Sequence, residues 1–282
     1  MSIAEKLQTI AENEQRVYEA GKAKGKADGI TEGYINGKTD GYAEGKADGF
    51  NVGYESGKAD GITEGIEEGK DAEYNRFWDD ALKAAAVGDF AFAGPFWTDK
   101  AFDPPRGTVI QPKRAVYMFA NAYITDLVTL CEEKEITIDF SKSTSLMYTF
   151  YGAYGAKFTR IGVVNTTGIN TLYGTFYSQS KLHTIVKIIL KEDGSQAFNT
   201  PFNGCSALEN LEIEGTIGQN GFNVSPCTKL SRASITSIVN ALSSTTSGLT
   251  VTISKTAKEA AFTDAEWADL IATKSNWTIS LN

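Results

Sequence analysis

Few residues of this chain have side chains suited to catalysis. His183 is the only histidine among the 282 residues, so a Ser-His-Asp or Cys-His site would have to use it. It lies in the run Lys181-Leu-His-Thr-Ile-Val, whose apolar residues are typical of a strand in a repetitive fold. This context predicts a structural histidine rather than a catalytic one.

The three cysteines, Cys131, Cys205 and Cys227, are odd in number and lack the close spacing of metal ligands. Cys205 and Cys227 lie 22 residues apart, in what look like consecutive repeats, so they could stack on each other. The favoured interpretation is that all three are small, buried apolar residues. A zinc site would need ligands that the sequence does not group together. We therefore predict no metal and no cofactor.

Carboxylates are the remaining candidates for chemistry, and Glu209, Glu212 and Glu214 stand close together. A cell-wall hydrolase would need a cluster of carboxylates that converge on one bond. These three instead alternate along a strand edge, as solvated residues do. We therefore predict that the protein is not an enzyme.

Charge and hydropathy exclude further classes of protein. The net charge of −8 leaves no basic stripe for nucleic acid, and no run of 18 or more apolar residues could span a membrane. Residues 1–16 are amphipathic and polar, unlike a signal peptide. We expect a protein that is virion-associated or extracellular without a signal peptide, or otherwise cytoplasmic.

The elements that would position any site begin with a glycine at every fourth residue, within a stretch that we delimit as residues 19–70. The series is Gly21, Gly25, Gly29, Gly33, Gly37, Gly41, Gly45, Gly49, Gly53, Gly57, Gly61, Gly65 and Gly69. Lys or a large apolar residue follows each glycine, and an acidic residue mostly precedes the next. Collagen requires glycine at every third residue, and the composition is poor for strands. A helix with a right-handed supercoil remains.

Glycine is costly in such a helix, at about 1 kcal/mol per residue relative to alanine, or on the order of 13 kcal/mol for the series. Glycine is useful where helix backbones approach closely, as in small-xxx-small contacts. The pattern therefore predicts a self-associating stem of two or three chains, with these glycines at the oligomerisation seam. The alternative interpretation is a flexible glycine-rich linker.

Helical signals flank the glycine stretch on both sides. Ser2 and Glu5 form a capping box at the start of an amphipathic helix over residues 1–18. If the helix runs without interruption to about residue 82, it is roughly 120 Å long. Residues 71–113 predict a helical collar that carries Tyr74, Phe77 and Trp78, followed by a loop. The loop aromatics, interpreted as a packed cap or as a sugar-binding platform, are Phe90, Phe92, Phe96, Trp97 and Phe102.

A second, looser repeat occupies residues 114–282. Phe150, Phe176 and Phe202 are 26 residues apart, and each precedes a small polar turn, spaced apolar residues and a short strand. Phe119 and Phe222 mark degenerate copies at the two ends. A period of 20–29 residues with one short strand per unit is the pattern of a leucine-rich-repeat solenoid.

The tail predicts a cap for this array. Ser231 or Ser234 can begin a helix that runs through Leu242, and residues 249–253 alternate as a strand. Thr263 with Glu266 forms a second capping box, and residues 277–281 predict a closing strand.

Two resemblances follow from these motifs. The run Phe202-Asn-Gly-Cys-Ser-Ala-Leu-Glu-Asn-Leu-Glu-Ile resembles the repeats of BspA-type leucine-rich-repeat proteins, which are surface and adhesion proteins. The tail and the glycine repeat that ends in Glu73-Tyr-Asn-Arg-Phe-Trp-Asp resemble those of phage and prophage fibre-like proteins of gut Firmicutes. This chain departs from the BspA pattern in having few and uneven repeats, so the solenoid would be short.

The sequence therefore predicts an α+β protein in which a long oligomeric helix precedes a short leucine-rich-repeat head with capping helices. The resemblance implies a fibre, as a dimer or more usually a trimer, that recognises a bacterial surface receptor or glycan. A cytoplasmic scaffold that uses the glycine helix for assembly is the alternative, since flagellar export stator proteins carry such helices. The candidate binding residues, which could equally pack between repeats, are Tyr148, Tyr151, Tyr154, Tyr173 and Tyr177.

Overall fold

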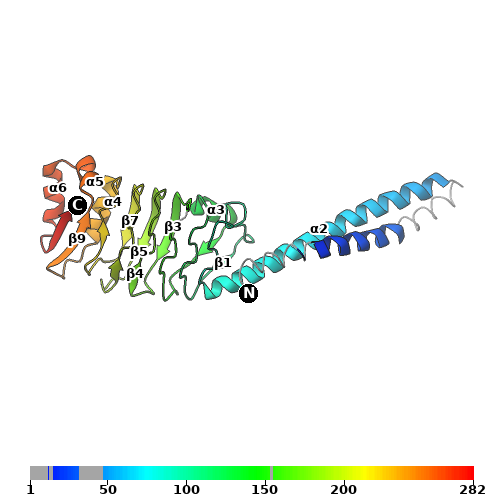
Figure 1. Ribbon diagram of the computed structural model, residues 1–282, viewed down its shortest axis with the longest axis horizontal. Helices are drawn as coiled ribbons and strands as arrows, with labels where there is room; N and C mark the ends of the chain where they lie inside the picture. The colour runs from blue at the N-terminus through cyan, green and yellow to red at the C-terminus, as the bar shows by residue number, and fades with distance from the viewer. Residues whose placement is uncertain (1–11, 13–14, 32–46, 153–154) are drawn as a thin grey trace. The chain divides into compact units, whose positions relative to one another are not determined.

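The computed structural model describes residues 12, 15–31, 47–152 and 155–282. The chain divides into two compact units, Met1–Ala81 and Leu82–Asn282, which are described separately below. The first contains a helical hairpin, and the second combines parallel strands with short helices (Figure 1). The α+β class predicted from the sequence is therefore confirmed.

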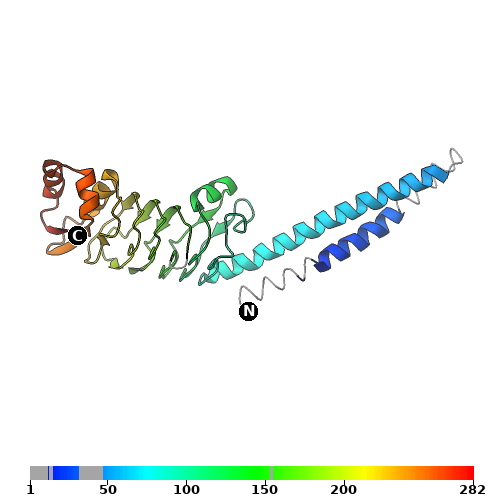
Figure 2. The same cartoon turned by 45° about the horizontal axis from the view of Figure 1, so that its top comes forward.

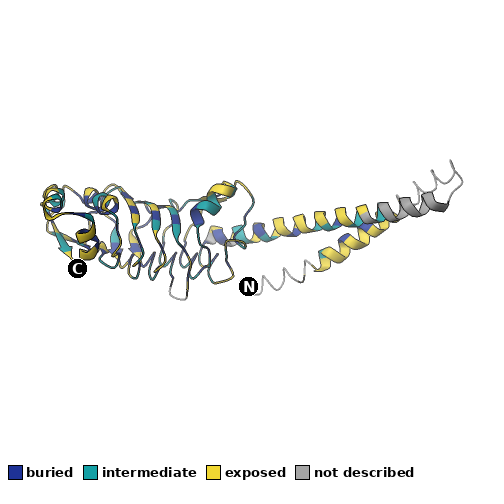
Figure 3. Cartoon of the chain, turned by 90° about the horizontal axis from the view of Figure 1, so that it is seen from above, coloured by how far each residue is buried: buried dark blue, intermediate teal, exposed yellow. Residues whose placement is uncertain are grey.

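The hairpin consists of a first helix over residues 15–31 and the helix α2 (Ala47–Val87). The two helices lie side by side in Figures 1 and 2. Gly21 faces Gly65, Gly25 faces Gly61, and Gly29 faces Gly57, so the two helices run antiparallel. The glycines of the first helix are buried, while most of its other residues are exposed (Figure 3).

Backbone contact explains why glycine occupies this seam. A Cβ atom added to Gly61 would lie 2.7 Å from the carbonyl oxygen of Gly25, and one added to Gly65 would lie 2.7 Å from that of Gly21. Any side chain would therefore force the helices apart, and their close approach offsets the low helix propensity of glycine. Charges at the rim add an exposed ion pair between Lys24 and Glu68 at 3.4 Å.

This arrangement differs from the predicted uninterrupted helix between residues 3 and 82. The close glycine contact is present, but it joins two segments of one chain. An exact four-residue period specifies a face for close packing and carries no information on whether the partner is the same chain or another. α2 ends at Val87, five residues beyond the limit expected near residue 82. The Ser2 capping box lies outside the described residues.

The second unit contains ten short strands among its described residues, and all of them pair in parallel. Their four sheets are β1 (Val109–Ile110) with β2 (Thr137–Ile138); β3 (Arg160–Asn165), β5 (Thr184–Ile189) and β7 (Asn210–Glu214); β4 (Thr171–Tyr173) with β6 (Ala197–Asn199); and β8 (Asn223–Val224), β9 (Leu249–Ile253) and β10 (Trp277–Leu281). Within the second sheet, Ile161, Ile185 and Leu211 are in register and buried. The 26-residue spacing read from the sequence is thus the register between β5 and β7, whereas Ile161 and Ile185 are paired across 24 residues.

A column of stacked phenylalanines forms the core beside these sheets. Phe119, Phe150, Phe176 and Phe202 are fully buried, and consecutive rings lie 5.5–5.6 Å apart with planes within 6° of parallel. Phe92 extends the column at one end, 5.2 Å from Phe119. We number the five segments that contain Phe92, Phe119, Phe150, Phe176 and Phe202 as repeats 1 to 5.

Backbone hydrogen bonds hold consecutive repeats in register at the phenylalanine positions. Their amides donate to the next repeat, from Phe92 to the carbonyl of Met118 (2.7 Å), from Phe119 to Thr149 (2.8 Å) and from Phe150 to Thr175 (2.8 Å). The predicted cap in the loop is confirmed for Phe92, Trp97 and Phe102, which are buried, while Phe90 and Phe96 are exposed.

Helices cover the edges of the sheets. The helix α3 (Leu127–Lys134) lies in the long repeat between Phe119 and Phe150, and Asp126 caps its N-terminus. At the other end, α4 (Arg232–Ala241) lies beside the edge strand β7. The hydroxyls of Ser234 and Ser237 accept hydrogen bonds from the amides of Leu211 and Ile213, both at 2.9 Å. Two serines thus satisfy a strand edge that would otherwise be open to further pairing.

The C-terminal elements match their sequence signals. Ser231 is the N-cap of α4, and α5 (Lys255–Ala261) and α6 (Asp264–Ala272) follow β9. Thr263 and Glu266 form the predicted capping box at the start of α6. β10 pairs with β9 and completes the last sheet.

Candidate functional site

Aromatic side chains gather along one edge of repeats 1 to 4. The rings of Phe90 and Tyr117 stack at 5.0 Å, and those of Tyr117 and Tyr148 stack at 5.1 Å. Tyr148 then meets Tyr173 edge to face at 5.3 Å. Phe90 is 53% exposed and Tyr173 is 38% exposed, so this first aromatic column lies at the surface.

Backbone geometry at this column is unusual. Phe90, Tyr117 and Tyr148 have φ values of 58°, 53° and 53°, in the left-handed region. Gly174 and Thr200 occupy the equivalent positions of repeats 4 and 5, also with positive φ. A left-handed residue other than glycine costs about 1–2 kcal/mol. In three consecutive repeats, an aromatic residue therefore occupies a position at which glycine would be less strained. Stacking of the rings offsets part of the cost of the left-handed backbone.

A second aromatic column runs beside the first. Tyr151 and Tyr177 stack at 5.9 Å, and Tyr151 meets Tyr117 and Tyr148 edge to face at 6.1 and 5.4 Å. Each follows a core phenylalanine directly, Phe150 in one case and Phe176 in the other. The structure thus brings Tyr148, Tyr151, Tyr173 and Tyr177 together, as one candidate surface would require. Tyr154 lies outside the described residues.

The hydroxyl of Tyr148 remains protonated near neutral pH. Partial burial, followed by interaction with the hydroxyl of Tyr173, raises the pKa of Tyr148 above its ordinary value. Protonated phenols donate and accept hydrogen bonds without carrying charge. The cluster therefore offers ring surfaces and, at Tyr148, a neutral polar group.

A hollow of about 540 Å³ adjoins the two columns. Its lining residues are Phe90, Ala93, Gly94, Pro95, Tyr117, Ala120, Asn121, Tyr123 and Tyr151. Ala93 and Ala120 occupy, in repeats 1 and 2, the position that Tyr151 and Tyr177 occupy in repeats 3 and 4. The hollow therefore exists where the second column lacks two rings.

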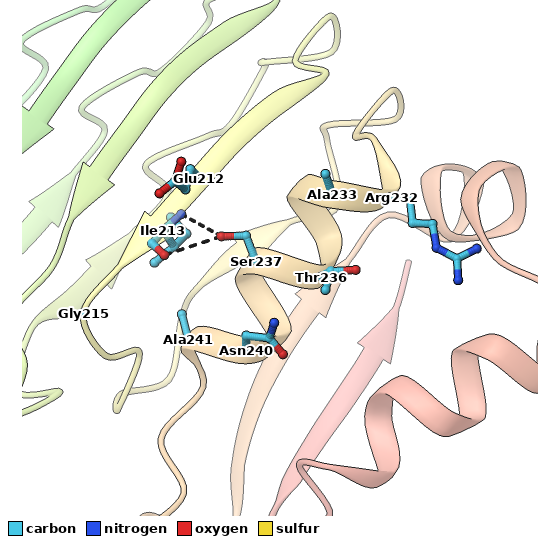
Figure 4. Close-up of a pocket in the computed structure, with 9 residues that line it drawn as sticks. All are labelled: Glu212, Ile213, Gly215, Arg232, Ala233, Thr236, Ser237, Asn240 and Ala241. Carbon is cyan, nitrogen blue, oxygen red and sulfur yellow. Dashed lines mark hydrogen bonds between the residues drawn. The ribbon is translucent and has the colours of Figure 1, made fainter.

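A second groove of about 840 Å³ lies between β7 and α4 (Figure 4). Ser237 points at Ile213 in this view, whereas Arg232 extends away from the strand. The charged groups of this groove are already engaged, since Arg232 pairs with Glu266 at 2.8 Å and Glu212 pairs with Lys187 at 3.0 Å. This groove therefore has fewer available groups for binding a ligand than the aromatic hollow has.

The residues that sequence analysis considered for catalysis remain apart from both grooves or are already paired. His183 lies 3.4 Å from Glu209, with both side chains partly exposed. Glu214 binds Lys187 at 2.8 Å, on the same lysine that pairs with Glu212. Within the described part of the chain, no group of three His, Cys, Asp or Glu residues could hold a metal ion.

The cysteines are free thiols. Cys205 and Cys227 are buried, as the sequence interpretation favoured, and Cys131 is half-buried. Burial raises the pKa of Cys205 to about 12, so this thiol is not ionised near neutral pH. Its Sγ atom donates instead to the carbonyl oxygen of Phe176 at 3.0 Å.

The glycines predicted at an oligomerisation seam divide into three groups. Gly21, Gly25, Gly29, Gly57, Gly61 and Gly65 form the seam of the hairpin, and an added Cβ at Gly69 would meet the side chain of Val17. Gly49 and Gly53 lie within α2. Gly33, Gly37, Gly41 and Gly45 lie outside the described residues.

Sequence reasoning missed the contribution of Phe90 and Tyr117 to the surface cluster. The signal was a recurring aromatic-x-Phe tripeptide, present at 90–92, 117–119 and 148–150. The last residue of each tripeptide belongs to the phenylalanine column of the core, and the first residue belongs to the first aromatic column at the surface. Unequal spacing of the first three repeats obscured this pattern.

Comparison with protein-family models, with characterised proteins and with solved structures finds no significant match for this chain. None of the helices in the described segments combines the length and the apolar character needed to span a membrane.

Proposed function

We propose that this protein is a non-enzymatic adhesion protein whose second unit recognises a cell surface. The observation that carries this proposal is the partly exposed aromatic cluster formed by Phe90, Tyr117, Tyr148, Tyr151, Tyr173 and Tyr177. Contiguous aromatic surface is typical of interaction sites on soluble proteins, because aromatic rings contribute much of the free energy of binding.

The repeats support a leucine-rich-repeat-like head in this role. Parallel strands at 26-residue spacing, a continuous phenylalanine core and a helix over the final edge are features that such solenoids share. The resemblance to fibre-like proteins of gut phages and prophages suggests a tail fibre or another virion appendage. The glycine helices would serve as its stem, as a dimer or trimer, and several copies would raise avidity for the host.

A monomeric scaffold or adaptor in the cytoplasm is the second candidate. The observation in its favour is that the glycine seam closes within one chain, between Gly25 and Gly61 for example, and so does not require a second copy. The stem and scaffold functions therefore differ in the expected number of chains.

Two measurements test the proposal. Light scattering during size exclusion gives the number of chains, and flow cytometry with labelled protein measures binding to a panel of intact gut bacteria. We expect an oligomer that binds some strains, and binding that falls about tenfold in the variant Tyr148→Ser/Tyr177→Ser. A matched control is Tyr18→Ser, which removes an exposed tyrosine from the first helix.

The outcomes separate the two candidates. A monomer that binds no cells would overturn the adhesion proposal and favour the scaffold. Cell binding that the double variant retains at full strength would place recognition elsewhere on the protein.

A further inference from the structure

The last strand of the second unit, β10, has one edge without a partner strand. It pairs with β9 on one side, and no strand among the described residues pairs with its other side (Figure 1). The edge of β7 differs, because Ser234 and Ser237 accept hydrogen bonds from its amides. Residues 275–282 contain no charged side chain and no proline, and the pairing of β10 has no bulge. This edge therefore lacks the devices with which edge strands commonly avoid further pairing.

Alternate residues of β10 direct their backbone groups to this free edge. The amide of Asn282 donates to the carbonyl oxygen of Ile253 in β9, 3.1 Å away. Because the backbone groups of a strand alternate between its two sides, the amides of Ile279 and Leu281 face away from β9. Neither of them donates to a backbone carbonyl elsewhere among the described residues. Both are therefore available to a further strand.

The core-facing side chains of β10 are less covered than those of β9. Val251 and Ile253 of β9 are fully buried. Their partners in β10 are Ile279, which is half-buried, and Leu281, which is 37% exposed. The apolar layer of this sheet thus continues beyond its last fully covered strand. A repeat array needs a cover for its final apolar layer, and a further strand beside β10 would extend that cover.

The sequence of β10 is complementary to a second copy of itself. In an antiparallel pair centred on Ile279, Trp277 of each copy lies opposite Leu281 of the other, so apolar residues meet on one face. On the other face, Thr278 lies opposite Ser280, so hydroxyls meet hydroxyls. The two Ile279 residues would exchange two backbone hydrogen bonds, and each Leu281 amide would reach a Trp277 carbonyl. With no charge on the strand, like charges do not meet at the symmetry axis.

We propose that two copies of this protein pair through β10 about a twofold axis. The strands β8, β9 and β10 of each copy would then form one continuous six-stranded sheet. This association goes beyond the proposed function, since it uses neither the aromatic cluster nor the glycine helices. Five residues from each copy bury a modest surface, so the pairing belongs to the weak class of interfaces and depends on concentration.

Light scattering on the full chain, from about 1 to 200 µM, measures the association. We expect Ile279→Pro to lower the mass twofold at the highest concentration. Proline removes the outward-facing donor at a position whose amide does not bond to β9. The matched control Ile279→Val keeps the amide and an apolar side chain, and it should keep the mass of the unmodified protein. Near-UV circular dichroism checks that the proline variant retains its tertiary packing.

Cysteine cross-linking tests the register without proline. Thr278→Cys and Ser280→Cys are made separately, each with Cys131→Ser, which removes the half-buried native thiol. In the proposed pair, position 278 of one copy lies opposite position 280 of the other, at a spacing suitable for a disulfide. Two copies of the same variant place their thiols diagonally and farther apart. With oxidised glutathione as the oxidant, an equimolar mixture should form disulfide-linked dimers about tenfold faster than either variant alone.

Two outcomes would overturn the proposal. One is a mass that a folded Ile279→Pro variant leaves unchanged, which would leave the edge of β10 to a strand of another protein. The other is a mixture that cross-links no faster than the single variants. If Ile279→Pro loses its near-UV signal, the cross-linking rates decide alone. Neither outcome contradicts adhesion, which the cell-binding assay measures separately.

Discussion

The hairpin and the repeat unit each depend on one residue type that recurs, yet the two recurrences act differently. In the hairpin, glycine removes side chains so that backbones touch, as at Gly25 and Gly61. In the second unit, phenylalanine supplies side chains that stack, as at Phe150 and Phe176. The glycine period is an invariant four residues, whereas the phenylalanine spacing varies from 26 to 31 among repeats 2 to 5.

The difference shows what strict and loose periodicity specify. Equivalent glycines at every fourth residue define a contact face, and many registers and partners would satisfy it equally well. The phenylalanine repeats differ in length, and side chains tie each one to the repeat before it: the hydroxyls of Thr149 and Thr175 donate to the backbone carbonyls of Ala115 and Leu146. The unequal spacing, 31 residues from Phe119 to Phe150 and 26 residues after that, therefore restricts the register, whereas the exact glycine period specifies only the type of contact.

The largest loss of stability should come from removing one ring of the phenylalanine column in the core of the second unit. Phe176→Ala deletes a fully buried ring that stacks on Phe150 and Phe202, both at 5.6 Å. A cavity of this kind costs about 3–5 kcal/mol, or roughly 10 °C in the melting temperature of the second unit. Differential scanning calorimetry measures this shift. Phe96→Ala, at a 42% exposed position, should change it little; equal shifts would refute a continuous core.

A smaller change in stability is expected for Gly61→Ala, and its sign distinguishes a packed seam from an exposed helix. In an exposed helix this change would stabilise by about 1 kcal/mol. At the seam, the new Cβ would lie 2.7 Å from the carbonyl oxygen of Gly25 and should destabilise the hairpin by about 1–3 kcal/mol. Hydrogen exchange of amides in residues 15–31 should therefore accelerate. The control Glu67→Ala changes an exposed residue of the same helix, and slower exchange in the glycine variant would contradict the seam.

The smallest expected change in stability comes from the charge of one carboxylate, that of Glu266. The hydrogen bond from the Thr263 amide, followed by the contact with Arg232, lowers the pKa of Glu266 from 4.5 to about 2. Because the folded-state pKa is depressed, this contribution to stability is complete above pH 4.5 and is lost as the pH falls toward 2. Glu266→Gln keeps the capping box, so its urea midpoint should vary less with pH across this window. Identical pH profiles would exclude a role for this carboxylate.

Local signals in the sequence predicted much of the fold. Capping residues predicted the start of α6 at Thr263 and gave Ser231 as one of two candidates for the start of α4, because N-cap chemistry depends on residues a few positions apart. The 26-residue spacing predicted from Phe150, Phe176 and Phe202 recurs between Ile185 and Leu211, which pair in a parallel sheet. Tyr148, Tyr151, Tyr173 and Tyr177 were expected either on the aromatic-rich faces of the repeats or packed between repeats, and the sequence did not decide between the two.

Other features depend on contacts that no local pattern contains. The reversal that pairs Gly21 with Gly65 follows from the whole chain, since an intramolecular seam avoids the entropy cost of bringing separate chains together. The hollow depends on Ala93 and Ala120, residues too common to indicate a site. They acquire meaning when the stacking of repeats aligns them with Tyr151.

The stacked rings of repeats 3 to 5 have a consequence for how this protein can diversify. Phe150, Phe176 and Phe202 are separated by equal lengths of chain and by nearly equal ring geometry, 5.6 Å with planes at 4° and 6°. A duplicated 26-residue unit inserted between them would find the same neighbours above and below. Copy number can therefore change by unequal recombination within this segment without disturbing the aromatic edge of repeats 1 and 2 or the serines that close β7.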